Sequence, residues 1–332
     1  YTVGSSGCDY TSIQAVFDNE DLEPRDVVEI RADTVGGEKT YIELIAIGSD
    51  DGGDSSGYVT IKGRDGDTIN IISGQIYDNS WTDLGDGKYS RSETNRVWIL
   101  LEDRNILQIA SDSNLTDGRY YWDVDEHALY YKPTSGVPSD HEIIASYSCL
   151  ASTPGGININ DVAYLRFKNL NFEKSSGGIV NYTSNGTSHI VIEDCNFSQV
   201  IIPTYISAST NGVVHGHITV SSCNFTHVSR AICCGTNSSD NTKYLTYTNN
   251  YIYKSGYVDE STLWKDKTNV DVDKEGIGLY RPIHAIVVGN TIVGGGYSGG
   301  IVLNTGGSPT ENCTDIKITR NKIYNLEGPG IY

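Results

Sequence analysis

The chain has 332 residues, and its 42 acidic and 24 basic residues give a net charge of -18. That balance argues against nucleic acid as a partner, because phosphate binding needs a basic face. With 36 glycines, 23 tyrosines and no methionine, the composition indicates a turn-rich β protein, and no stretch is apolar enough for a membrane span.

The first residues predict a short amphipathic helix. Residues 3–18, VGSSGCDYTSIQAVFD, place Ile13, Val16 and Phe17 on one helical face. Because the chain begins at Tyr1 and not at Met, we expect an exported protein whose leader has been removed, secreted or at the cell surface. Early strands are expected next, at residues 26–32, 58–63 and 69–74.

Residues from about 76 to 146 break the rhythm of the rest of the chain and predict a small β insertion. Three of the four tryptophans lie there, together with the Tyr-rich run GRYYWDVDEHALYYKP. Packing is one role for these rings. The other is a sugar-stacking surface built from Tyr120, Tyr121, Trp122 and Tyr130, of which Trp122 and Tyr130 are the substrate-binding candidates.

From about residue 147 onward, one phrase returns at regular intervals. VIEDCNFSQV at 191–200 is followed by TVSSCNFTHV at 219–228. We take the residue two positions before the central Phe or Ile as the reference position, or anchor, of each repeat. Apolar residues stand five and three positions before each anchor, the alternation of a strand with one buried face. The anchors, spaced by 25, 28, 27, 40 and 31 residues, are Leu170, Cys195, Cys223, Asn250, Asn290 and Asn321.

Each repeated unit reads as strand, turn, strand. The second strands are expected at GGIV (177–180), AICC (231–234), GIGL (276–279), GGIVL (299–303) and GIY (330–332). A unit of about 25 to 30 residues has no room for a crossover helix, so it predicts one coil of a solenoid.

With these repeats, the chain resembles the right-handed parallel β-helix (pectin-lyase-like) superfamily. The resemblance implies one all-β domain over residues 1–332, a right-handed parallel β-helix solenoid with an N-terminal helical cap at about 1–25. The β insertion would occupy about 76–146 and the regular coils about 147–332.

In that superfamily, equivalent residues stack one coil apart. The resemblance implies an asparagine ladder from Asn250, Asn290 and Asn321. Cys195 and Cys223 would be neighbours at a strand spacing of roughly 4.8 Å, where a disulfide and simple stacking of two small buried residues both remain open.

The superfamily includes lyases, hydrolases, esterases, phage tailspikes and adhesins, so the fold leaves the activity open. The segment GSSGCDYTSIQA is similar to the start of pectin methylesterases, whose paired-Asp and Gly-Arg-Pro-Trp motifs are missing, and HGHI at 215–218 is a fragment of a polygalacturonase motif. The resemblance implies an exported protein that binds polysaccharide and cleaves it by lyase or glycoside hydrolase chemistry. The alternative is a non-catalytic extracellular structural or adhesive protein.

A polar ladder is expected four residues after the anchors. A basic line on an acidic protein could hold a polyanion, or it could be a solvated turn ladder. In a lyase, a cation that neutralises a uronate carboxylate acidifies the neighbouring C5 proton for removal by a base. The substrate-binding candidates are Lys174 and Gln199, and the catalytic candidates are His227, Arg230 and Lys254.

The unit between two anchors, Asn250 and Asn290, exceeds its neighbours by about a dozen residues, and long loops on a rigid scaffold tend to carry function. Its extra residues lie at 256–276. We expect two further catalytic candidates here, Glu275 as part of a carboxylate pair and Arg281.

The same loop contains DVDKEG, which resembles the first half of a calcium-binding loop. Asp271, Asp273 and Glu275 stand at alternate positions before a glycine, as metal ligands do in that motif. The twelfth position would be Pro282, which has no carboxylate. Calcium and a solvated acidic loop therefore both remain open.

The sequence stops at Tyr332, inside an expected strand and without a cap. An uncapped coil exposes unpaired backbone groups. Further coils or a second subunit are expected to cover it, so self-association through this coil is a further prediction.

Overall fold

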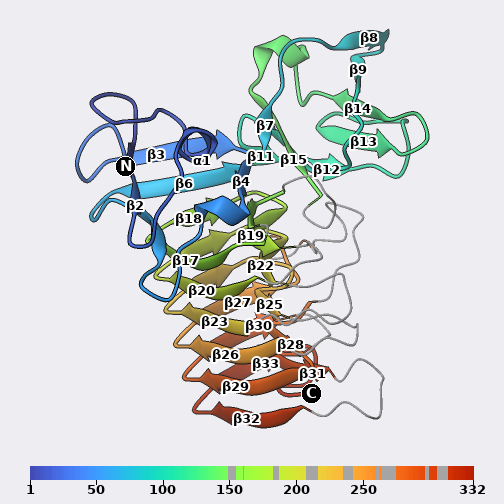
Figure 1. The fold of residues 1–332 in the computed structure, drawn as a ribbon. Coiled ribbons are helices and arrows are strands. Elements are labelled where there is room, and N and C mark those ends of the chain that lie inside the picture. The colour runs from blue at the N-terminus through green and yellow to red at the C-terminus, as the bar shows by residue number, and fades with distance from the viewer. Residues whose placement is uncertain are drawn as a thin grey trace.

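The structure is a computed structural model. It describes residues 1–148, 155–159, 161–181, 187–206, 216–234, 242–258, 262, 274–295, 299–304 and 313–332. Successive coils stack along one axis, and their strands form three parallel sheets. In Figure 1 the N-terminus lies at the upper left and the C-terminus near the bottom. No helix of the described residues is long and apolar enough to cross a membrane.

We call the three parallel sheets A, B and C, and their strands follow one another around each coil. In the described residues, sheet A comprises β1 (Thr2–Val3), β2 (Val27–Ile30), β5 (Val59–Gly63), β17 (Ala163–Lys168), β20 (Ser188–Glu193), β23 (Gly216–Ser221), β26 (Thr242–Thr248), β29 (Pro282–Val288) and β32 (Thr314–Thr319). Sheet B comprises β3 (Glu38–Glu43), β6 (Thr68–Ser73), β18 (Asn171–Glu173), β21 (Asn196–Ser198), β24 (Asn224–Thr226), β27 (Tyr251–Ser255), β30 (Thr291–Gly295) and β33 (Lys322–Leu326). Sheet C comprises β4 (Ile45–Ile47), β16 (Ile157–Ile159), β19 (Gly177–Asn181), β22 (Ile202–Ile206), β25 (Ile232–Cys234), β28 (Ile277–Tyr280) and β31 (Ile301–Asn304).

The predicted register of the repeat is confirmed. Leu165 pairs with Ile190, and the same row continues through Ile218, Leu245, Ala285 and Ile316. These side chains point into the coils and are fully buried except Ile316 in the last described coil, which is half-buried. Period-two alternation therefore selects the residues of the core.

Two stacks of identical side chains run through the core beside the anchors. The rings of Phe172, Phe197 and Phe225 lie parallel, with centroids 4.9 Å apart at each step. The asparagine ladder implied by the resemblance is present too. The Asn290 side-chain N–H donates to Asn321 Oδ1 at 3.0 Å, and Asn290 Oδ1 accepts the Asn250 side-chain N–H at 3.0 Å.

The two anchor cysteines are free thiols, which settles the open choice between a disulfide and simple stacking. Cys195 and Cys223 are both buried and unbridged. Burial raises the pKa of the Cys195 thiol well above its usual range. Both therefore act as small apolar residues of the core.

The N-terminal helix α1 (Gln14–Asn19) covers the first coil as expected. Ile13 and Val16 are fully buried in the core, and Phe17 packs against it half-buried. The Glu43 carboxylate of β3 accepts backbone N–H groups at the start of the helix, from Ile13 at 2.9 Å and from Gln14 at 3.0 Å. Burial raises the pKa of Glu43.

The β insertion leaves and re-enters the solenoid at one turn, between sheet B and sheet C of the second coil. Ser146 donates its hydroxyl to the carbonyl of Ser73 at 2.6 Å, which holds the two ends of the insertion together. Its smaller sheet comprises β11 (Asn105–Ile106), β10 (Val97–Glu102), β15 (Ile143–Tyr147) and β7 (Gln75–Ile76). Its larger sheet comprises β12 (Gln108–Ile109), β13 (Arg119–Asp123), β14 (Ala128–Lys132), β9 (Lys88–Ser92) and β8 (Thr82–Gly85). The insertion projects from the N-terminal end of the solenoid, at the upper right of Figure 1.

Three details differ from the sequence expectations or add to them. The strands β3 and β4 of the first coil were not expected, and two short 3₁₀ helices, η1 (Ser49–Asp51) and η2 (Pro138–Asp140), interrupt loops. The expected last strand at 330–332 is reduced to a single bridge between Ile301 and Ile331. Self-association at this end stays a prediction.

Candidate functional site

The outer face of sheet C carries a cluster of polar side chains where β25 and β28 lie side by side. In these strands Ile232, Cys234 and Leu279 point into the core. Alternation therefore turns Cys233 and Tyr280 outward. The cluster on this face comprises Arg230, Cys233, Glu275 and Tyr280, which we call the Arg230–Glu275 cluster.

Arg230 is the centre of the cluster. Its Nη2 donates to the Tyr280 hydroxyl at 3.1 Å, and its Nη1 lies 3.3 Å from the Cys233 sulfur. Its Nε lies 3.5 Å from Glu275 Oε2. The Tyr280 hydroxyl in turn donates to Glu275 Oε1 at 3.2 Å. Each polar group is thus oriented by at least one other.

Burial controls the protonation of this cluster. The side chains of Arg230 and Glu275 are 11% and 5% exposed. Burial raises the pKa of Glu275 above its usual range, while Arg230 and Tyr280 act in the opposite direction. Burial also raises the pKa of Tyr280 and of the Cys233 thiol. Glu275 is therefore the group of the cluster whose pKa moves towards neutral pH, whereas the pKa values of Tyr280 and Cys233 move away from it.

Two long segments, the β insertion and the unit between Asn250 and Asn290, leave the solenoid at the same kind of turn. The insertion lies between β6 and β16, and the long unit lies between β27 and β28, both on the way from sheet B to sheet C. Trp98 and Ile144 of the insertion pack in one buried cluster with Val180 and Ile202 of sheet C and with Val258 of the long unit. The insertion therefore borders the outer face of sheet C on the N-terminal side of Arg230.

Of the five predicted catalytic residues, the structure brings Arg230 and Glu275 together. Arg281 lies directly after β28, is 5% exposed, and donates its backbone N–H to the Asn304 carbonyl at 2.8 Å. His227 lies instead directly after β24, and Lys254 lies near the end of β27, both at the sheet B side of the turn to sheet C. Tyr280 and Cys233 were not predicted as site residues. Strand alternation could have identified both, because Tyr280 follows the buried Leu279 and Cys233 precedes the buried Cys234.

The predicted polar ladder is a stack of residues with a left-handed backbone at the ends of the sheet B strands. Lys174, Gln199, His227 and Lys254 all have positive φ, between 49° and 57°. Their backbones follow one another from coil to coil: the His227 N–H donates to the Tyr253 carbonyl at 2.9 Å. The Gln199 side chain donates to the Val258 carbonyl at 3.0 Å. This ladder therefore supports the start of the long unit.

The expected calcium ligands Asp271 and Asp273 lie outside the described residues. Among the described residues, one group places three metal-binding side chains within reach of one another: Glu102, Asp103 and His141. His141 Nε2 lies 2.7 Å from the Ser135 carbonyl, and its Nδ1 lies 2.7 Å from Asp103 Oδ2. Both ring nitrogens face acceptors, so the geometry fits an imidazolium in an ion pair and not a metal ligand.

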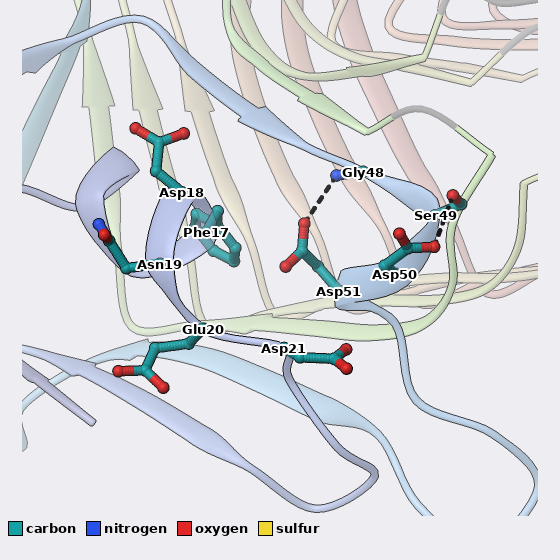
Figure 2. Close-up of a pocket in the computed structure, with 9 residues that line it drawn as sticks. All are labelled: Phe17, Asp18, Asn19, Glu20, Asp21, Gly48, Ser49, Asp50 and Asp51. Atoms are coloured by element: carbon teal, nitrogen blue, oxygen red, sulfur yellow. Dashed lines mark hydrogen bonds between the residues drawn. The ribbon is translucent and has the colours of Figure 1, made fainter.

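A cavity of about 680 Å³ lies at the N-terminal end, between α1 and η1. Figure 2 shows its acidic lining, with Asp18, Glu20 and Asp21 on one side and Asp50 and Asp51 on the other. Burial raises the pKa of Asp51, whose Oδ2 accepts the Gly48 N–H at 2.9 Å. Like charge makes this cavity unsuitable for an acidic polysaccharide.

The insertion orders the aromatic residues that were expected to bind sugar. Tyr120 is fully buried and donates its hydroxyl to the Trp98 carbonyl at 2.7 Å, so it is not part of a surface. Tyr121 and Tyr130 stack with centroids 6.2 Å apart, and Trp122 is half-buried on the opposite face of the same sheet, against the cluster that contains Tyr120 and Leu129. Those three rings remain accessible in part.

Sheet A carries an outer stack of rings that the sequence did not reveal. Neighbouring rings lie 4.1 to 5.0 Å apart and nearly parallel, in the order Tyr164, His189, His217, Tyr244 and His284. Each of these residues has a φ of 57° or 58°, which interrupts the strand alternation once per coil. At the end of the stack, His284 Nδ1 lies 2.6 Å from Asp315 Oδ2.

No protein-family model matches the sequence, and no curated protein matches it. Among solved structures, the chain is similar to XylC in complex with xylose, with a TM-score of 0.55 and 11% identity, covering 100% of this chain and 63% of that one. A glycoside hydrolase gives a TM-score of 0.40 at 9% identity, covering 92% of this chain and 89% of that one. The Gp54 tailspike of Acinetobacter baumannii bacteriophage AP22, in complex with capsular saccharide, gives 0.16 at 10% identity, covering 92% and 64%.

This chain thus spans 63% of the length of the XylC structure. At 11% identity the likeness bears on the fold and not on the ligand. It agrees with the three parallel sheets and with the in-register stacking of the repeat. The chain is therefore a right-handed parallel β-helix protein, as its resemblance to the pectin-lyase-like superfamily implied.

Proposed function

We propose that this protein binds polysaccharide and cleaves it at the outer face of sheet C, with Glu275 as the group that transfers a proton. The observation that carries the proposal is the burial of Glu275 beside Arg230 and Tyr280, which raises its pKa. A carboxylic acid whose pKa is raised keeps its proton to a higher pH, which is what the general acid in glycosidic bond cleavage needs.

Two kinds of cleavage use such a face, and the geometry favours hydrolysis. A lyase needs a cation that can reach a uronate carboxylate, whereas the Arg230 side chain is only 11% exposed and its guanidinium already contacts Tyr280 and Cys233. A hydrolase needs a second carboxylate near the acid. Asp273 is the candidate nearest in sequence and lies outside the described residues.

The class of ligand rests on the fold and on charge. XylC, whose fold this chain shares, was solved with xylose, and a saccharide is accordingly the ligand that we propose here. With a net charge of -18, the protein favours neutral sugars unless cations gather locally. The proposal also places the protein outside the cell, where polysaccharides are accessible. Calcium at Asp271 and Asp273 stays a prediction.

The test is a screen of neutral and acidic polysaccharides. New reducing ends measure hydrolysis, and the ultraviolet absorbance of unsaturated products measures elimination. We expect reducing ends without unsaturated products, and we expect Glu275→Gln to lower the rate by about 10²- to 10⁴-fold. Glu327→Gln, at an exposed glutamate of the last described coil, serves as the control.

A second readout separates catalysis from folding. As a general acid, Glu275 must be protonated, so activity should fall as the pH rises through its raised pKa. Thermal unfolding of Glu275→Gln shows whether the variant is folded. A folded variant with wild-type activity contradicts the proposal, and so does inactivity of the wild type on the whole panel with and without calcium.

A further inference from the structure

The β insertion contains a pocket that is separate from the Arg230–Glu275 cluster. The pocket has a volume of about 260 Å³ and lies where the short strand β12 ends beside β13. β12 pairs with β13 only through Gln108–Arg119 and Ile109–Tyr120. Beyond these two pairs, β12 no longer pairs with this edge of β13. Ile109, Tyr121 and Trp122 line the pocket beside the edge.

Strand geometry supplies this pocket with backbone hydrogen-bonding groups. The Tyr120 carbonyl accepts the Ala110 N–H at 2.7 Å, so the backbone of Tyr120 faces β12. Backbone groups two residues apart on a strand face the same side. The N–H and C=O of Trp122 therefore face the pocket, where they suit the hydroxyl groups of a sugar.

Aromatic and apolar side chains form the wall of the pocket. The indole N–H of Trp122 donates to the Glu93 carbonyl at 3.1 Å, which fixes the orientation of the ring. Val124 stands at the rim and is 60% exposed. A few polar groups in an aromatic wall are typical of sites for small ligands, and ring faces suit the apolar faces of sugars.

Arg96 adds a positive charge to the same pocket. It is exposed and lines the pocket, and no carboxylate within the described residues forms an ion pair with it. By contrast, Arg91 pairs with Asp78 at 3.4 Å in the same insertion. Arg96 is the one cation among the described residues of the lining, and its guanidinium fork fits a carboxylate, while the Tyr121 hydroxyl of the same lining donates to Asp123 Oδ2 at 3.4 Å.

We infer that this pocket binds the carboxylate-bearing unit of an acidic polysaccharide, a uronic acid residue, through Arg96 and Trp122. The inference rests on the proposed function only in that the ligand is a polysaccharide, and it adds that units of the chain carry a carboxylate. Binding here needs no cleavage. The insertion would then hold an acidic chain while a neighbouring stretch reaches the outer face of sheet C.

The test uses the full chain and sodium glucuronate, with glucose as the neutral probe, in calorimetric titrations at one ionic strength. We expect glucuronate to bind at least about tenfold more tightly than glucose, because a hydrogen bond to a charged group changes the affinity by about that factor or more. Arg96→Gln should remove that preference. Val124→Asp should weaken glucuronate binding about tenfold through like charge.

Val35→Asp is the matched control, since Val35 is 81% exposed and the variant gains the same charge away from the pocket. It should bind glucuronate as the wild type does. Equal affinity of Val35→Asp and Val124→Asp overturns the inference. Equal binding of glucuronate and glucose by the wild type does so too, as does failure to bind glucuronate.

A last comparison separates this inference from the proposed function. Glu275→Gln should keep wild-type affinity for glucuronate while it loses cleavage. A protein that binds glucuronate at Arg96 and cleaves no polysaccharide supports the pocket and rejects the catalytic proposal. A protein that cleaves polysaccharide with unchanged rates and unchanged glucuronate affinity in Arg96→Gln rejects the pocket alone.

Discussion

The rings of His189 and His217 stack on neighbouring coils, with centroids 4.3 Å apart and planes inclined by 11°. Two imidazolium ions at this separation repel each other, so the stack favours the neutral form of His189. Burial, and then the neighbouring His217, lowers the pKa of His189 below its usual value. The outer stack on sheet A is therefore sensitive to acid.

The first prediction follows from the lowered pKa. Stability from neutral His189 is complete above the unfolded pKa of about 6.5 and is lost as the pH falls through the folded pKa. The melting temperature should fall between about pH 7 and pH 5, and less so in His189→Gln. His127→Gln, at an exposed turn, is the control. Identical pH profiles for the wild type and His189→Gln would show that the stack has no such role.

The second prediction concerns His141, whose contribution to stability depends on pH in the opposite direction. Its hydrogen bonds to Asp103 and to the Ser135 carbonyl raise its pKa. The stability that it gives the insertion is complete below about pH 6.5 and is lost as the pH rises through the raised pKa. Relative to the intrinsic rise of exchange with pH, the protection of backbone amides in β10 and β15 should therefore fall above neutral pH. The same loss of protection in His141→Gln would contradict this reading.

The third prediction concerns the buried pair of Arg230 and Glu275. Above the raised pKa of Glu275, where its carboxylate is charged, Arg230→Met leaves that charge buried without its cation and should lower the free energy of unfolding by roughly 3 to 5 kcal/mol. The double variant Arg230→Met, Glu275→Leu should recover much of that loss, because no buried charge remains. Urea unfolding measures both. A single variant as stable as the wild type would mean that water reaches Glu275 freely.

The fourth prediction concerns the asparagine ladder. Asn290 is fully buried and its side chain donates to the Tyr247 carbonyl at 2.9 Å, in addition to its bonds within the ladder. Asn290→Ala leaves several buried groups unsatisfied, at about 1 to 3 kcal/mol each, so the free energy of unfolding should fall by about 3 kcal/mol or more. Asn79→Ala, at an exposed position, should change it by less than about 0.5 kcal/mol.

The fifth prediction concerns the phenylalanine stack. Phe197 has a parallel ring 4.9 Å away on each side, so Phe197→Ala opens a cavity between two coils. The loss of unfolding free energy should be about 3 to 5 kcal/mol, and Phe197→Leu should lose less. Tyr324→Ala, at a ring 48% exposed, is the control. Equal losses for Phe197 and Tyr324 would show that the stack does not stabilise the coils.

The sequence by itself determined the solenoid, its register and its core. Leu165 and Ile190 could be paired from the repeat alone, because in-register stacking places equivalent residues one coil apart and alternation fixes which of them are buried. The ladder of Asn250, Asn290 and Asn321 followed from the resemblance on the same grounds. Part of the candidate site could also be predicted from the sequence, because Arg230 was named with the polar ladder and Glu275 with the long unit between Asn250 and Asn290.

Only the tertiary structure decided which polar side chains meet. Arg230 and Tyr280 lie 50 positions apart in the chain and are joined by coils of unequal length, so no spacing rule predicts their 3.1 Å hydrogen bond. The stack of His189 and His217 depends on a left-handed backbone residue in each coil, which strand alternation does not anticipate. The pocket beside Trp122 exists because β12 ends early against β13, and where a strand ends depends on packing around it more than on its own residues.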